Sequence, residues 1–87
     1  MKQHWNIELD FEEDGTRTHC TASLSGPGAP GVQSVGIARR NPDDLPDAGI
    51  GEDLAAARAC SKLADDLVKQ AAAGIEDHTH RPAHLQL

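Results

Sequence analysis

The sequence predicts an α+β fold, with a three-stranded antiparallel sheet (β-β-β-α) covered on one face by a long C-terminal helix. Residues 5–11 alternate between apolar and polar side chains, which is typical of a half-buried strand. The Asp14-Gly15 dipeptide that follows favours a hairpin turn. Residues 51–73 contain no proline and place apolar side chains at helical spacing. With 87 residues, the chain is predicted to be a single domain, in which residues 76–87 form a C-terminal tail.

The turn chemistry predicts a register for the first hairpin. If Asp14 and Gly15 are the two loop residues of a type I′ turn, the second strand begins near Thr16 and all apolar side chains lie on one face. The predicted pairs are Phe11–Thr18, Leu9–Cys20, Ile7–Ala22 and Trp5–Leu24 on the apolar face, and Glu12–Arg17 and Asp10–His19 on the polar face.

The next two segments are predicted to be a loop and a third strand. Residues 25–31 contain three glycines and two prolines and are expected to be irregular. A strand is expected over residues 32–39, with Val35 and Ile37 facing inward and Gly36 and Ala38 on the opposite face. That face, or an unpaired strand edge, is the expected place for self-association. Residues 41–49 are expected to be a second connection.

The helix is predicted to begin near Gly51, with Glu52 and Asp53 in its first turn. Gly74 either ends this helix or lies inside it, because Ile75 continues the apolar spacing. The tail after it is either a docked extended segment or disordered. The apolar residues at helical spacing are Leu54, Ala57, Ala64, Leu67, Val68, Ala71 and Ile75.

Four segments together resemble a known family. They are WNI at 5–7, GIARRNP at 36–42, GEDLAAARA at 51–59 and THRPAHL at 79–85. In order and spacing they are similar to small actinobacterial proteins of unknown function whose fold is like that of the double-stranded-RNA-binding domain. The resemblance implies a three-stranded antiparallel sheet with a long C-terminal helix, and it implies no activity.

The fold analogy suggests RNA binding, but the negative net charge of the chain argues against it. Eight Lys and Arg residues face 14 Asp and Glu residues, giving a formal net charge of −6, and such a surface repels phosphate backbones and anionic lipid. Double-stranded-RNA-binding domains present lysines at the start of the C-terminal helix, where this chain has Gly51, Glu52 and Asp53. We therefore expect no nucleic-acid or membrane partner. No apolar run is long enough to span a bilayer, so we expect a cytoplasmic location.

Histidines in the tail are the best metal candidates. In an extended segment His78 and His80 would point the same way, and His84 would close on them after a turn. A histidine-rich tail without metal is the favoured interpretation, and no cofactor is expected. Cys20 and Cys60 are both predicted at core-facing positions, as buried structural thiols.

The basic pair Arg39 and Arg40 is a candidate anion site. The favoured interpretation is that these arginines pair with the nearby Asp43, Asp44 and Asp47. The spacing of these aspartates does not match a calcium loop.

The sequence contains no convincing catalytic constellation, and we do not expect an enzyme. The predicted function is a non-enzymatic protein-interaction or self-association module, which binds itself or an unidentified protein. The predicted surface is Gly36, Ala38, Arg39 and Arg40. The alternatives are metal or small-ligand binding through the tail histidines, and nucleic-acid binding by fold analogy.

Overall fold

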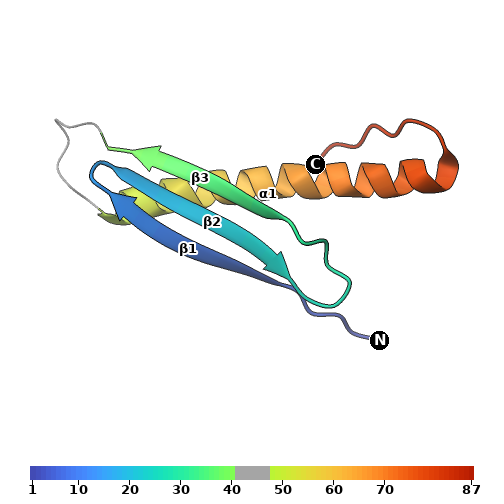
Figure 1. Ribbon diagram of the computed structural model, residues 1–87, viewed down its shortest axis with the longest axis horizontal. Coiled ribbons are helices and arrows are strands. Elements are labelled where there is room, and N and C mark those ends of the chain that lie inside the picture. The colour runs from blue at the N-terminus through green and yellow to red at the C-terminus, as the bar shows by residue number, and fades with distance from the viewer. Residues whose placement is uncertain (41–47) are drawn as a thin grey trace.

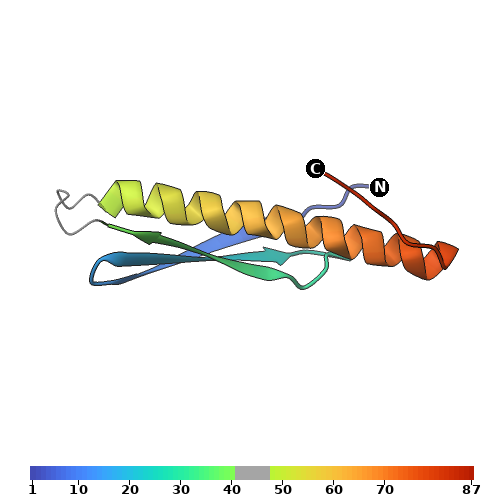
Figure 2. The same cartoon turned by 90° about the horizontal axis from the view of Figure 1, so that it is seen from above.

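The computed structural model describes residues 1–40 and 48–87. Its elements are β1 (Asn6–Asp14), β2 (Arg17–Ser25), β3 (Gln33–Arg39) and α1 (Ala48–Thr79) (Figure 1). The strands form one antiparallel sheet in the order β1-β2-β3, and α1 lies along one face of it (Figure 2). The predicted fold class, a three-stranded sheet followed by one long helix, is confirmed.

The first hairpin forms as predicted, but its register differs by two residues. The loop residues are Gly15 and Thr16, and Gly15 alone of the two has a positive φ, at 61°. A glycine at the first central position is typical of a type II′ turn, whereas type I′ needs positive φ at both positions. A shift of two residues leaves every side chain on its predicted face. The observed pairs are Ile7–Leu24, Leu9–Ala22 and Phe11–Cys20 on one face, and Asp10–Thr21, Glu12–His19 and Asp14–Arg17 on the other.

The predicted orientation of β3 is wrong. Gly36 and Ala38 face the helix and are buried, whereas Val35 and Ile37 are 45% and 43% exposed on the outer face. A Cβ atom at Gly36 would overlap the backbone of Ala55 and Ala59 in α1. The helix therefore lies directly on the backbone of β3, which only glycine permits. Gly36 and Ala38 are unavailable as the predicted interaction surface.

The side of α1 that faces the sheet is also different from the predicted one. Its buried residues are Ala55, Ala59 and Leu63, while Leu54 is 44% exposed. Small side chains are needed here because the helix approaches the sheet so closely. Among the described residues the buried core is small and consists of Cys20, Ala22, Leu24, Ala38, Ala55, Ala59 and Leu63.

The helix continues past Gly74 to Thr79, so the alternative in which this glycine lies inside the helix is the observed one. The residue after the helix, His80, has a positive φ of 57°. The His80 amide donates a hydrogen bond of 2.7 Å to the Glu76 carbonyl, as in a left-handed helix cap. Beyond the cap the chain turns back and runs beside α1 (Figures 1 and 2).

Candidate interaction surface

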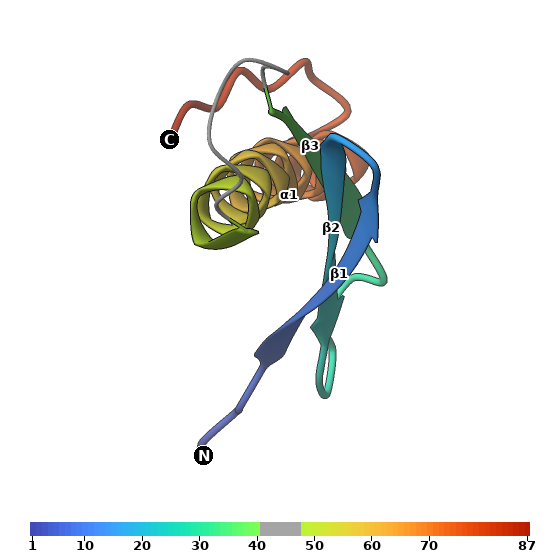
Figure 3. The same ribbon diagram turned by 90° about the vertical axis from the view of Figure 1, so that its left-hand side faces the viewer.

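The helix covers only part of the sheet. It packs mainly against β3 and β2, and in Figure 3 β1 curves away from it. The central strand β2 alternates between buried and less buried residues, as expected of a strand under a helix, whereas all nine residues of β1 are exposed. The side of β1 that faces the helix layer is therefore left without a cover.

This uncovered side of β1 is apolar. Four large side chains lie along it at every second position, beginning one residue before the strand, and we call them the apolar strip. Its members are Trp5, Ile7, Leu9 and Phe11, which are 45%, 52%, 37% and 39% exposed. Directly opposite Ile7, Leu9 and Phe11 on β2 lie buried residues. The strip is therefore an exposed continuation of the core.

The loop after β2 positions one end of the strip. The Trp5 indole Nε1–H donates a hydrogen bond of 3.0 Å to the Pro27 carbonyl. At Gly26, which has a φ of 141°, a Cβ atom would lie 2.7 Å from the Trp5 ring. Sequence reasoning treated this glycine- and proline-rich segment only as a connection. The structure shows that it also holds the tryptophan at the end of the strip.

Two side-chain hydrogen bonds hold α1 over β3. The buried Ser34 hydroxyl donates to Asp66 Oδ2 at 2.7 Å, and Arg58 Nη1 donates to the Ile37 carbonyl at 2.7 Å. Together with the close contact at Gly36, these bonds fix the helix toward one side of the sheet. The strip on β1 is exposed as a consequence.

Most of the charge on β1 lies on the other face of the strand. Glu8, Asp10 and Glu12 alternate with the apolar residues and point away from the helix layer. Glu13, which lies opposite the buried Thr18, is the one carboxylate of β1 on the face of the strip, and it lies beyond Phe11 at the end of the strand. A partner that covers the strip itself leaves Glu8, Asp10 and Glu12 exposed.

The two cysteines differ in environment, so the prediction of two buried thiols is correct only for Cys20. Cys20 is buried opposite Phe11, whereas Cys60 is exposed. Burial raises the pKa of the Cys20 thiol above its ordinary value of 9.0, and the negative charges of Cys60 and Asp10 raise it further.

We expect alkaline pH to destabilise the protein through Cys20. Because its pKa is higher in the folded than in the unfolded state, its contribution to stability is complete below pH 9.0 and is lost as the pH rises through the folded value. Urea unfolding at several pH values measures this effect. Cys20→Ala should flatten the alkaline decrease in unfolding free energy, and Cys60→Ser should retain it. Equal decreases in Cys20→Ala and the parent protein would contradict the assignment.

The tail histidines do not have the extended arrangement on which the metal hypothesis depended. His78 lies in α1, His80 forms the helix cap and His84 lies in the returning tail. Within residues 1–40 and 48–87, no three His, Cys, Asp or Glu side chains are grouped so that they could hold a metal ion.

The basic pair follows β3 directly. Arg39 is exposed and lies opposite Arg17, while the Arg40 amide donates a 2.8 Å hydrogen bond to the Thr16 carbonyl. The predicted partners of these arginines, Asp43, Asp44 and Asp47, lie outside the described residues. Their pairing stays a prediction.

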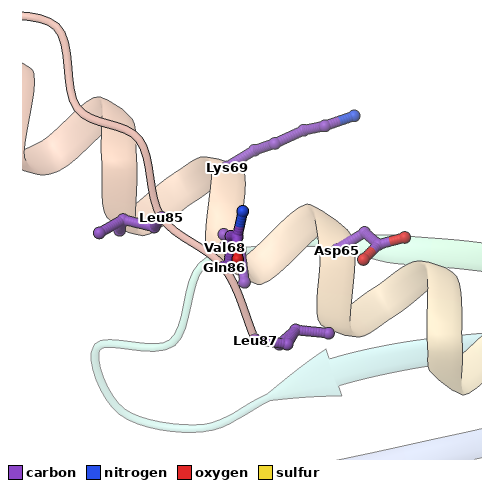
Figure 4. Close-up of a pocket in the computed structure, with 6 residues that line it drawn as sticks. All are labelled: Asp65, Val68, Lys69, Leu85, Gln86 and Leu87. Atoms are coloured by element: carbon purple, nitrogen blue, oxygen red, sulfur yellow. The ribbon is translucent and has the colours of Figure 1, made fainter.

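Residues 76–79 of the predicted tail belong to α1, and residues 80–87 form an extended segment that runs back beside the helix (Figure 1). The last residues of this segment form a shallow groove of about 380 Å³ with α1, and Figure 4 shows the end of the tail beside the helix. Leu87 remains 85% exposed, so the contact is slight. The groove is lined by Asp65, Val68, Lys69, Leu85, Gln86 and Leu87.

Comparison with known proteins decides the family. The Rv2632c-like family model matches residues 3–84. The chain belongs to this family. It is 45% identical to the uncharacterized protein Rv2632c of Mycobacterium tuberculosis over 76 residues, which cover 87% of this chain and 81% of that protein. It is 37% identical to the uncharacterized protein Mb1767 of Mycobacterium bovis over 83 residues, covering 95% and 87% of the two chains.

A solved structure of an Rv2632c-like protein shares the fold. The crystal structure of Rv2632c matches with a TM-score of 0.82 and 39% identity, and the match covers 94% of this chain and 96% of that chain. The prediction that the chain belongs to an actinobacterial family of unknown function is thus confirmed, and that family is the Rv2632c-like family. The likeness to the double-stranded-RNA-binding domain stays a prediction. In the described part of this Rv2632c-like chain, no helix has the length and apolar character needed to cross a membrane.

Proposed function

We propose that this Rv2632c-like protein is a non-enzymatic interaction module that binds another protein, or itself, through the apolar strip. The observation that supports this proposal is the exposure of four large apolar side chains at 37–52% beside a core of mainly Ala. Side chains of this size, exposed to this extent, leave roughly 350 Å² of contiguous apolar surface. Patches of about 300–600 Å² are often binding surfaces.

Covering the strip would also strengthen the fold. Leu63 and Cys20 are the largest fully buried side chains among the described residues. A domain of about this size has a small free energy of unfolding. A partner that binds the folded state alone stabilises it by mass action. Binding through the strip is therefore coupled to folding.

We also propose a cytoplasmic location. Cys20 and Cys60 are both free thiols, and reducing compartments keep cysteines in this form.

Site-specific photocrosslinking tests the proposed module. A photoreactive amino acid replaces Leu9 in the strip or, as the matched control, Asp10 on the opposite face of β1, in a mycobacterial expression host. We expect a protein crosslink from position 9, to a different protein or to a second copy, and little from position 10. No crosslink from position 9, or equal yields from both positions, would contradict the proposed function.

A further inference from the structure

We propose that the occupant of the apolar strip is the strip of a second copy of this chain, packed face to face about a two-fold axis. This inference rests on the proposed function and adds the identity of the partner. It is derived from three properties of the strip: the order of its side chains, the placement of charge on β1, and the area that it exposes.

The order of side chains along the strip is self-complementary. From Trp5 to Phe11 the sequence of classes is aromatic, aliphatic, aliphatic, aromatic. A two-fold axis between Ile7 and Leu9 runs the second strip antiparallel to the first. Trp5 then meets Phe11 of the second copy, and Ile7 meets Leu9 of the second copy. Such an isologous contact closes after two copies, and it pairs aromatic rings with each other at both ends.

Charge selects face-to-face packing over pairing of the β1 edges. In an antiparallel edge pair that keeps the apolar residues on one side, the acidic residues of the two copies would face each other. In one such register Asp10 lies opposite Asp10 and Glu8 lies opposite Glu12, and like charges directly opposed are destabilising. Packing through the strips leaves Glu8, Asp10 and Glu12 on the outer faces, while Glu13 lies beyond Phe11 at the end of each strip. The carboxylates of the two copies then stay apart and hydrated.

The exposed area is consistent with a dimer interface. The strip supplies roughly 350 Å² of apolar surface from each copy, which is a suitable apolar centre for an interface of about 800 Å² per partner. It would add four large side chains from each copy to a core in which, among the described residues, the buried large aliphatic side chains are Leu24 and Leu63. A second copy is present whenever the chain itself is present, so it can complete the core in every molecule.

Sedimentation velocity and fluorescence of the purified full chain test the dimer. Trp5 is the only tryptophan, so its emission reports directly on the strip. Between roughly 1 and 200 µM, we expect a monomer-to-dimer transition together with a blue shift of Trp5 emission. Leu9→Arg should weaken association by at least about tenfold. Asp10→Arg places the same side chain on the other face of β1 and should retain the dimer.

Each outcome decides a different part of the inference. A chain that is monomeric at about 200 µM and crosslinks from position 9 to a different protein overturns the dimer, but leaves the proposed function intact. A monomer without any crosslink from position 9 overturns both. A dimer unaffected by Leu9→Arg would assemble elsewhere and would also overturn the inference. If circular dichroism shows that Leu9→Arg is unfolded, Ile7→Gln serves as the strip variant with the same expected direction.

Discussion

Gly36→Ala is expected to lower the free energy of unfolding by about 3 kcal/mol, near the upper end for an overpacked core. The added Cβ would overlap the backbone of Ala55 and Ala59. Backbone atoms of a helix cannot turn aside as a flexible side chain can, so α1 must move away from β3. That movement would separate Ser34 from Asp66, which are hydrogen-bonded at 2.7 Å. Urea unfolding followed by far-UV circular dichroism, at one fixed protein concentration, measures the loss.

Two other glycines provide matched controls for this substitution. A Cβ at Gly31 or at Gly74 would meet nothing within 4 Å, and neither residue has a positive φ. Gly31→Ala should change stability by less than about 0.5 kcal/mol. Gly74→Ala should stabilise the protein by about 1 kcal/mol, because Gly74 lies inside α1. If Gly36→Ala and Gly31→Ala had the same effect, the close contact between helix and sheet would be wrong.

Leu63→Ala is expected to cost about 3 kcal/mol of unfolding free energy, within the range for a buried leucine. Leu63 is 1% exposed and is one of the two largest fully buried side chains in the described residues. The core has few other large side chains to collapse into the space. Chemical denaturation of the purified variant measures the cost.

Leu54→Ala, on the same helix, is the matched control for Leu63→Ala. Leu54 is 44% exposed, so this truncation should cost less than about 1 kcal/mol. Equal losses in the two variants would show that the sheet-facing side of α1 has been assigned incorrectly.

Local patterns in the sequence predicted the elements and the faces of the first hairpin. Alternation from Trp5 to Phe11 placed these side chains on one face, and the turn at Gly15 joined β1 to β2. The exact register was less accessible, because Asp14-Gly15 and Gly15-Thr16 both serve as two-residue loops. Strand faces repeat every two residues, so the hydrophobic pattern is the same for both registers.

The orientation of β3 could not be predicted from apolarity alone. Val35 and Ile37 alternate with Gly36 and Ala38, and the usual expectation places the larger apolar pair inside. The deciding factor is how closely α1 approaches the sheet. That distance depends on small residues in two elements at once, Gly36 on the strand and Ala55 and Ala59 on the helix.

The apolar character of the candidate site was predictable from the sequence, but its exposure to solvent was not. Sequence reasoning identified the apolar face of β1 and treated it as core, and it assigned self-association to Gly36 and Ala38. Exposure of β1 depends on the sideways position of α1, which Arg58 and Asp66 hold over β3. Hydrogen bonds between residues this far apart in the chain have no local sequence signal.

The most direct test of the face-to-face dimer through the strip is an isotope-filtered NOE experiment on a mixture of labelled and unlabelled chains. Face-to-face packing predicts contacts between the Leu9 methyl groups of one copy and the Ile7 methyl groups of the other, because β1 is left uncovered by α1. Intermolecular contacts confined to Val35 and Ile37 on the outer face, or no intermolecular contacts at all, would contradict this account.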